Sequence, residues 1–423
     1  MHVFSVVGTG GNVELQGEVS VGGAKNAVLP IIAASLLMQG ETKLENVPNI
    51  ADVHSMNSLV EALGAYTTLR DDTLSVRTQD ANATVLDENI AKRLRASVLL
   101  VGAVLARSSK VSFPHPGGCV LGSRPIDLFV EGFKELGCEA KEENDIYTLS
   151  APNGIQGGDI FFRVISVTAT ETFMIAATKA TAPVTLRNCA MEPEVVALAN
   201  FLKMCGARIE GAGTPTIIIH PSHLEPPDAT FRVIPDRLEA GSFLILGALL
   251  GKDVAIHNTE PEDLEAVVEA LRAMGVTIAV SDKTLRVSRP ENLSAIHIRT
   301  HEHPGFPTDL QAPMAVLLTQ ATGKSSILET VFDGRLNYID DLVRMGADAE
   351  VWNPHKVTIK GPTPLKARDI DGPDIRAGLA FLLAATVASG ESHIGNAHLI
   401  DRGYEHIEEK LQKLGVQIKR VIP

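Results

Sequence analysis

Two kinds of apolar segment alternate along the chain. Six segments are apolar on nearly every face of a helix, whereas six others carry apolar residues on one helical face only. A helix that is apolar all round is buried, and a one-sided helix covers a core. The pattern therefore predicts six buried helices and six half-exposed ones; in one of the latter the apolar face consists of Leu264, Val267, Val268, Leu271 and Met274.

The two kinds recur in a fixed order, which indicates six copies of one α/β unit. In each copy, an extended segment, a loop and a fully apolar helix precede a strand, a second loop, an amphipathic helix and a glycine. The apolar halves span 19–37, 91–106, 162–180, 231–250, 298–320 and 370–388, and the amphipathic halves span 42–65, 110–138, 184–207, 254–276, 325–347 and 392–416. The closing glycines, about 70 residues apart, are predicted to end their helices with positive φ: Gly64, Gly137, Gly206, Gly275, Gly346 and Gly415. Coincidental patterning is the alternative, but six copies at near-constant spacing argue against it.

Six units divide naturally into two groups of three. Three buried helices and three half-exposed ones form a compact bundle faced by short sheets, so we expect an α/β fold of two similar domains, each of three units packed around buried helices. We place the chain crossings near Lys25 and Pro235. The first domain then spans 25–234, the second combines 1–24 with 235–423, and the active site is expected in the cleft between them.

Composition narrows the class of function. The chain is 45% hydrophobic and 21% charged, as in an ordinary globular protein, and its net charge of -13 argues against non-specific binding to nucleic acid or a membrane surface. We see no signal peptide and no apolar run long enough for a bilayer. Four cysteines without a CxxC pair favour a reducing cytoplasm and suggest neither disulfides nor a metal site, and no cofactor is predicted. The oligomeric state is not predicted.

One loop concentrates chemistry, the stretch PGGCVLGSRPIDL from Pro116 to Leu128. Gly117 and Gly118 allow positive φ, which would leave the side chain of Cys119 pointing into open space. A nearby cation such as Arg124 and a helix N-terminus both favour the thiolate. The alternative is that Cys119 is a small buried hydrophobe, the reading that we give to Cys138, Cys189 and Cys205.

Cations gather in equivalent loops of the six units. In the amphipathic halves these are Arg124, Arg335 and Arg402, and the loops before the apolar helices carry Lys25 with Asn26, Arg95, Ser166, Arg237, Asp309 and Arg376. Loops that precede helix N-termini form good anion sites, and guanidinium groups bind phosphate or carboxylate in bidentate geometry. Any one of these residues could be an ordinary surface residue, but the set predicts an anionic substrate.

Two of these residues stand apart. Lys25 follows Gly22 and Gly23 and opens a buried helix, so we interpret it as a phosphate contact in a glycine-rich turn, although GGAKN is not a Walker A motif. Asp309 follows the rigid run Pro-Gly-Phe-Pro-Thr. Either Thr308 or Asp309 could cap the helix that follows, whereas the functional interpretation of Asp309 is a base held at a cleft.

These motifs resemble the UDP-N-acetylglucosamine 1-carboxyvinyltransferase family of enolpyruvyl transferases. The resemblance covers essentially the whole chain and rests on GGAKNAVLPIIAASLL, RASVLLVGAVLA, PGGCVLGSRPIDL, IPDRLEAGSFL, PGFPTDLQAP and DRGYEHIEEKL. It implies the inside-out α/β barrel of that family and the first committed step of peptidoglycan synthesis. The shikimate-pathway enolpyruvyl transferases are similar in fold but have a different lysine motif and lack the PGGC loop.

The resemblance implies the following roles. Phosphoenolpyruvate would be held by Lys25, Arg124 and Arg402, with Asn26, Arg95, Arg335 and Arg376 nearby. Cys119 would protonate the methylene carbon of phosphoenolpyruvate and could add covalently to the enolpyruvyl carbon. It would also be alkylated by fosfomycin. Asp309 would take the proton from the sugar 3-hydroxyl. The UDP-sugar would be contacted by Arg124, Pro125, Ile126, Asp127, Leu128, Ser166, Val167 and Val331.

One departure from the family leaves the acceptor open. Where the family reads Lys-Val-Ser-Val-Gly-Ala-Thr, this chain reads VISVTAT, so Val164 replaces a lysine and Thr168 a glycine. Arg163 could compensate, although neighbouring residues of a strand point to opposite faces. One alternative is a paralogue that acts on another nucleotide sugar or on shikimate 3-phosphate. The PGGC loop argues against shikimate 3-phosphate. A non-catalytic relative is another, although such a protein is expected to have lost Cys119, Asp309 or Lys25, which are all present.

Overall fold

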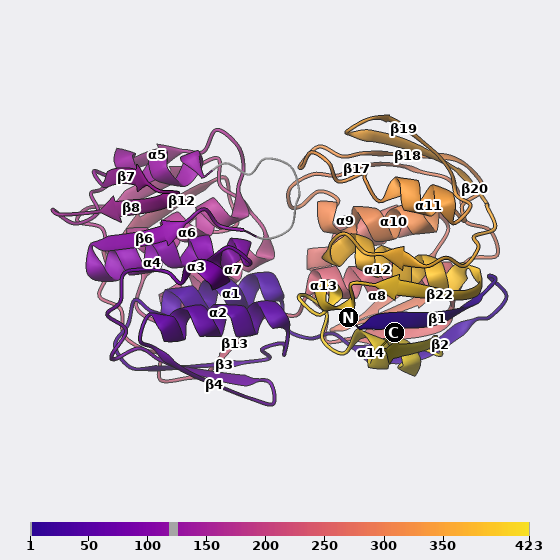
Figure 1. Ribbon diagram of the computed structural model, residues 1–423, viewed down its shortest axis with the longest axis horizontal. Coiled ribbons are helices and arrows are strands. Elements are labelled where there is room, and N and C mark those ends of the chain that lie inside the picture. Colours follow the sequence, from indigo (N-terminus) through magenta and orange to yellow (C-terminus); the bar gives the residue numbers. More distant parts are fainter. Residues whose placement is uncertain (1, 118–125, 423) are drawn as a thin grey trace. The chain divides into compact units, whose positions relative to one another are not determined.

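The computed structural model describes residues 2–117 and 126–422, which form two compact units (Figure 1). The continuous unit comprises 23–117 and 126–234, and the split unit comprises 2–22 and 235–422. The chain passes between the units at Gly22–Gly23 and at Ile234–Pro235. The boundaries predicted from the repeat pattern are 24/25 and 234/235. The two crossing segments are hydrogen bonded to each other, because the Asp236 N–H donates to the Gly22 carbonyl (2.9 Å) and the Ala24 N–H donates to the Ile234 carbonyl (2.8 Å).

Three internal helices contact one another in the core of the continuous unit: α1 (Lys25–Ser35), α4 (Val98–Ser108) and α6 (Val167–Ala177). The outer helices are α2 (Ala51–Ala62), α5 (Asp127–Glu135) and α7 (Pro193–Met204), and the short elements are α3 (Glu88–Ala91) and the 3-10 turn η1 (Arg95–Ser97). Small residues allow the internal helices to pack closely. A Cβ on Gly102 of α4 would lie 2.4 Å from the Thr172 carbonyl oxygen of α6.

Three small sheets belong to this unit. Their strand orders are β13-β3-β5-β4, β11-β12-β10-β9 and β6-β8-β7. The strands are β3 (Glu41–Glu45), β4 (Tyr66–Arg70), β5 (Thr73–Arg77), β6 (Lys110–Pro114), β7 (Glu139–Glu143), β8 (Ile146–Ser150), β9 (Gly158–Phe161), β10 (Val184–Arg187), β11 (Arg208–Glu210), β12 (Thr216–His220) and β13 (Phe231–Arg232). In Figure 1 the sheet of β3, β4 and β13 lies on one side of the helices of this unit.

The split unit repeats this arrangement. Its internal helices are α8 (Arg237–Leu250), α10 (Gln311–Leu318) and α12 (Ile375–Val387), which contact one another. The remaining helical elements are α9 (Glu265–Ala273), α11 (Ile339–Arg344), α13 (Ala397–Ile400), α14 (Ile407–Lys413), η2 (Pro261–Leu264) and η3 (Thr308–Leu310). Every internal helix is buried along nearly its whole length, as an all-round apolar sequence predicts.

The sheets of the split unit have the orders β15-β16-β14-β2, β17-β18-β20-β19 and β21-β22-β1-β23. The strands are β1 (Val3–Thr9), β2 (Leu15–Ser20), β14 (Gly251–His257), β15 (Thr277–Ser281), β16 (Thr284–Ser288), β17 (His297–Arg299), β18 (Gly323–Leu328), β19 (Asp348–Asn353), β20 (Lys356–Gly361), β21 (Ile370–Asp371), β22 (Ser389–Gly395) and β23 (Gln417–Val421). β1 lies between β22 and β23, so both chain ends belong to one sheet.

The pairing pattern confirms a repeated unit. In each four-stranded sheet one edge strand pairs in parallel with its neighbour, and the other pairings are antiparallel. The six predicted closing glycines all have positive φ, between 77° at Gly137 and 109° at Gly346. The predicted apolar face of the α9 region is also confirmed, because Leu264, Val267, Val268, Leu271 and Met274 are all buried. Among the described residues no helix has the length and apolarity needed to cross a bilayer.

Candidate active site

Lys25 and Asn26 form the first turn of the internal helix α1. Lys25 Nζ lies 3.6 Å from Asp52 Oδ2 of α2, and both side chains are largely buried. Neither of the preceding glycines, Gly22 and Gly23, has positive φ. Glycine is required at position 23 for a close approach, since a Cβ there would lie 1.7 Å from the Asn46 carbonyl oxygen.

Arg95 holds the backbone that leads into the cysteine loop. It lies in η1, immediately before α4, and its Nη1 donates to the Pro116 carbonyl (3.4 Å). Burial lowers the pKa of Arg95. The Gly117 N–H donates to the Ala91 carbonyl (3.2 Å) of α3. These two hydrogen bonds fix the start of the loop on α3 and η1.

The prediction that Gly117 is a glycine because it adopts positive φ is wrong. Its φ is not positive, and glycine is needed because a Cβ would lie 1.4 Å from the Lys92 carbonyl oxygen. Gly118, Cys119, Arg124 and Pro125 lie outside the described residues.

The predicted UDP-sugar contacts of the continuous unit lie at the N-termini of α5 and α6. Ile126 is buried in the core, while Asp127 and Leu128 open α5 and are partly exposed. Ser166 caps α6 by accepting the Ala169 N–H (3.2 Å), and Val167 is the first residue of that helix.

Arg163 lies in the segment between β9 and α6 and pairs with α5. Its guanidinium pairs with Asp127 Oδ2 and with Glu131 Oε2 (3.2 Å), while the neighbouring Val164 is 59% exposed. The other oxygen of Asp127, Oδ1, is buried and has no hydrogen-bond partner among the described residues. Arg163 is thus a cation beside the predicted sugar contacts, although it is engaged by two carboxylates.

In the split unit the structure brings Asp309, Arg335 and Arg376 together. Asp309 lies in η3, directly before α10, and Arg376 is the second residue of α12. Asp309 Oδ1 accepts from Arg335 Nη1 (2.7 Å) and from Arg376 Nε. The interpretation of Thr308 or Asp309 as a helix cap is wrong, because neither η3 nor α10 has a side-chain cap.

Arg335 is the most deeply buried member of this cluster, with a side chain only 4% exposed. Burial lowers its pKa, as does Arg376 to a smaller extent, while Asp309 acts in the opposite direction. Its guanidinium carbon lies 4.6 Å from the centre of the Phe332 ring. Its Nε and Nη2 are buried without a hydrogen-bond partner among the described residues, so two donors of a buried cation are left for an anion.

Sequence analysis missed Glu329, which lies beneath this cluster. Glu329 is fully buried and accepts hydrogen bonds from the segment of Asp309 and from the segment that carries Val331 and Arg335. Nothing in the sequence marks it, because a glutamate at the end of a strand is ordinarily exposed.

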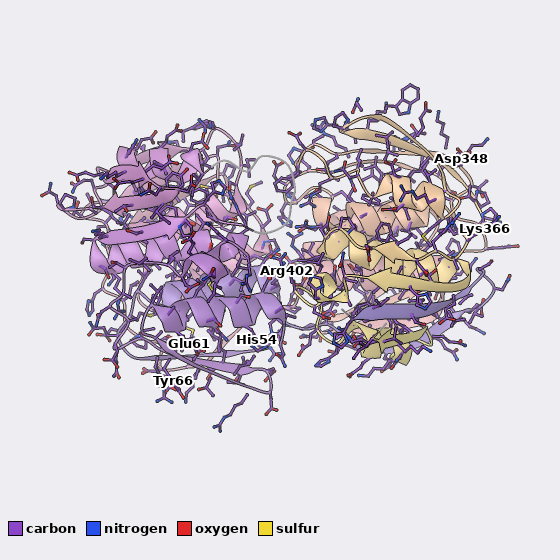
Figure 2. The ribbon with its side chains drawn as sticks, in the orientation of Figure 1. His54, Glu61, Tyr66, Asp348, Lys366 and Arg402 are labelled. Carbon is purple, nitrogen blue, oxygen red and sulfur yellow. The ribbon has the colours of Figure 1, made fainter. Side chains whose placement is uncertain are left out.

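Arg402 follows α13 and is partly buried. Figure 2 labels it beside that helix. The three described cysteines, Cys138, Cys189 and Cys205, are buried, as predicted, and burial raises their pKa values to about 11, about 12 and about 12. Among the described residues no group of histidine, cysteine and carboxylate side chains could hold a metal ion.

The chain resembles curated proteins over nearly its whole length. The profile of the family described as "EPSP synthase (3-phosphoshikimate 1-carboxyvinyltransferase)" matches residues 10–411. The UDP-N-acetylglucosamine 1-carboxyvinyltransferase of Nostoc sp. is 41% identical over 99% of this chain and 94% of its own length. The protein of the same name from Anaeromyxobacter dehalogenans is 42% identical over 97% and 98%.

Solved structures share the fold at lower identity. The enolpyruvyl transferase NikO from Streptomyces tendae superposes with a TM-score of 0.89 at 23% identity, covering 100% of this chain and 99% of that one. An EPSP synthase from Acinetobacter baumannii gives 0.73 at 16% identity, covering 100% of both chains.

Proposed function

Because this chain belongs to the UDP-N-acetylglucosamine 1-carboxyvinyltransferase family, we propose that the clustered cations and Asp309 serve the enolpyruvyl transfer of that family. The 3-hydroxyl oxygen of UDP-N-acetylglucosamine bonds to C2 of phosphoenolpyruvate while a proton adds to C3. The tetrahedral product then loses phosphate from C2 and a proton from C3, which restores the double bond. This reaction is the first committed step of peptidoglycan precursor synthesis.

In the split unit, Asp309 is the base that takes the hydroxyl proton. Its two guanidinium partners, Arg335 and Arg376, hold its Oδ1 in place and put positive charge beside the crowded anionic intermediate. Arg402 is proposed as a further contact of phosphoenolpyruvate and Val331 as a contact of the sugar nucleotide.

In the continuous unit, Lys25 is the phosphate contact, with Asn26 and Arg95 beside it. Cys119 is the acid that protonates C3, and Arg124 binds the same substrate. The sugar nucleotide lies against Pro125, Ile126, Asp127, Leu128, Ser166 and Val167. The proposal requires residues of both units to act on one pair of substrates, in the interdomain cleft that the family resemblance implies between two inside-out α/β barrels.

The observation that supports this function most is the state of Arg335. A buried cation with two unpaired donor nitrogens is costly, and a carboxylate or phosphate that accepts from both removes the cost. Both proposed substrates are anions. A protein of net charge -13 that binds them must place its cations locally, as it does here.

Two residues near the proposed nucleotide contacts offer the acceptor no free charge, because Val164 is apolar and Arg163 is held by Asp127 and Glu131. A cytoplasmic location stays a prediction from the cysteine content.

Phosphate release from phosphoenolpyruvate by the purified protein, with and without UDP-N-acetylglucosamine, tests the proposal. Release should require the sugar nucleotide and should fall at least 100-fold in Cys119→Ala and in Asp309→Asn. Cys138→Ala, which removes a buried thiol, is the matched control and should retain activity. Release that is independent of the sugar nucleotide, or equal in Asp309→Asn and Cys138→Ala, contradicts the proposal.

A further inference from the structure

Glu329 follows β18 directly and is fully buried. Its two carboxylate oxygens accept from different segments of the chain. Oε1 accepts the backbone N–H groups of Val331 (2.9 Å) and Phe332 (3.1 Å). Oε2 accepts the Thr308 hydroxyl (2.8 Å) and Gln311 Nε2 (3.3 Å).

These two segments carry the groups that the proposed reaction uses. Thr308 immediately precedes Asp309, and Gln311 follows it by two residues in the first turn of α10. Val331 and Phe332 begin the loop that continues to Arg335, whose Nη1 donates back to Asp309 (2.7 Å). The two segments are therefore joined twice, by the buried carboxylate of Glu329 and by the Arg335–Asp309 pair.

We propose that Glu329 is a positioning residue, which fixes Asp309 relative to Val331 and Arg335 by binding both segments through its two oxygens. This inference rests on the proposed function of Asp309 as the base. Glu329 acts through these neighbours and is not assigned a contact with either substrate.

A carboxylate is the group that this place requires, because all four partners donate. A glutamine could preserve the Val331 side by placing its amide oxygen at Oε1, but its NH₂ group would then face the Gln311 NH₂ group. Gln311 cannot simply turn over, since its Oε1 accepts the hydroxyl of the buried Tyr338 (2.8 Å). Glu329→Gln should thus loosen the Asp309 segment while leaving the Val331 segment in place.

Two threonines at opposite ends of the α10 region supply a matched test. The Thr308 hydroxyl donates to Glu329, whereas the buried Thr319 hydroxyl donates to the Val316 carbonyl (2.7 Å). Thr308→Val and Thr319→Val remove one hydroxyl each by the same isosteric change. Only the first breaks the connection to Glu329.

The steady-state constants of Glu329→Gln, Thr308→Val and Thr319→Val are compared with those of the wild type at a temperature where all four are folded. Misplacing a reacting group by about 1 Å costs up to about 100-fold in rate, so kcat should fall about 10- to 100-fold in Glu329→Gln and Thr308→Val. The KM for UDP-N-acetylglucosamine should stay within about twofold, and Thr319→Val should resemble the wild type. A role in stability alone would lower the melting temperature and leave kcat unchanged, which would overturn the inference.

Amide hydrogen exchange makes the test independent of the substrate assignment. Peptides covering 306–311 should exchange faster in Glu329→Gln and Thr308→Val than in Thr319→Val. If the wild type releases no phosphate with these substrates, the proposed function fails. The positioning inference is then decided by exchange alone, and equal exchange in the three variants refutes it.

Discussion

Glu171→Gln should raise the stability of the continuous unit, and the gain should grow with pH. Glu171 lies in the middle of the internal helix α6, is 3% exposed, and has an Oε1 without a hydrogen-bond partner among the described residues. Burial raises the pKa of its carboxyl well above the ordinary value of 4.5, and the carboxylates of Glu194 and Glu192 raise it further. The folded protein therefore keeps a proton that the unfolded chain releases.

The sign and size of the effect follow from this difference in bound protons. The stability associated with the protonated carboxyl is fully present below pH 4.5 and is lost as the pH rises toward the folded-state pKa. The loss amounts to about 1.4 kcal/mol per pH unit, because one proton is taken up on folding. A glutamine has nearly the same shape and no proton to lose. Wild type and variant should thus be similar near pH 4.5 and diverge by that amount per unit above it.

Urea unfolding at pH 5, 6 and 7 measures the divergence. The only tryptophan, Trp352, lies in the split unit, so its fluorescence would not report on the continuous unit. Unfolding of the continuous unit is instead followed by hydrogen-exchange labelling of α6 peptides, with every labelling pulse given at the same pH. Glu135→Gln, which removes an exposed carboxylate of the same unit, is the control and should show no such slope. A constant difference between wild type and Glu171→Gln across this pH range would refute the reasoning.

Three further predictions concern thiols, helix packing and a buried ion pair. A thiol reagent at pH 8 should label one cysteine in the native wild type and none in Cys119→Ala, since the other three thiols are buried; labelling of two or more contradicts this. Gly102→Ala should cost about 1–3 kcal/mol, because its Cβ would meet the Thr172 carbonyl at 2.4 Å, and equal urea midpoints for variant and wild type would show that the helices can separate. Lys410→Met should cost about 3–5 kcal/mol in the split unit, because Lys410 Nζ pairs with the buried Glu239 Oε1 at 2.5 Å. Burial already raises the pKa of Glu239 while Lys410 lowers it, so the measured loss should be larger at pH 8 than at pH 5, and a loss independent of pH would contradict this cause.

The repeated architecture could be predicted because it depends on patterns that occur six times. All-round apolar segments became α1, α4, α6, α8, α10 and α12, and each closing glycine has positive φ. Such features follow from local composition and from the steric freedom of glycine. A single sequence is enough to show them.

Individual contacts of the site could not be predicted in this way. The requirement for Gly117 comes from Lys92, a residue of another element that no local rule places nearby. The roles of Thr308 and Glu329 depend on a hydrogen bond across 21 residues of chain. Pairing between distant segments is fixed by the packing of whole elements, so a buried acceptor such as Glu329 has no signature in the pattern.

The repeat also explains how an acidic protein can bind two anionic substrates. In each unit several of the proposed residues occur where internal helices begin: Lys25 opens α1, Arg95 precedes α4 and Val167 opens α6, while Asp309 precedes α10 and Arg376 lies in the first turn of α12. The N-terminus of a helix carries about half a positive charge and several unpaired N–H groups. The three such termini of the continuous unit add a fixed positive potential that contributes nothing to the net charge of -13. A few lysines and arginines are then sufficient to hold the two anionic substrates.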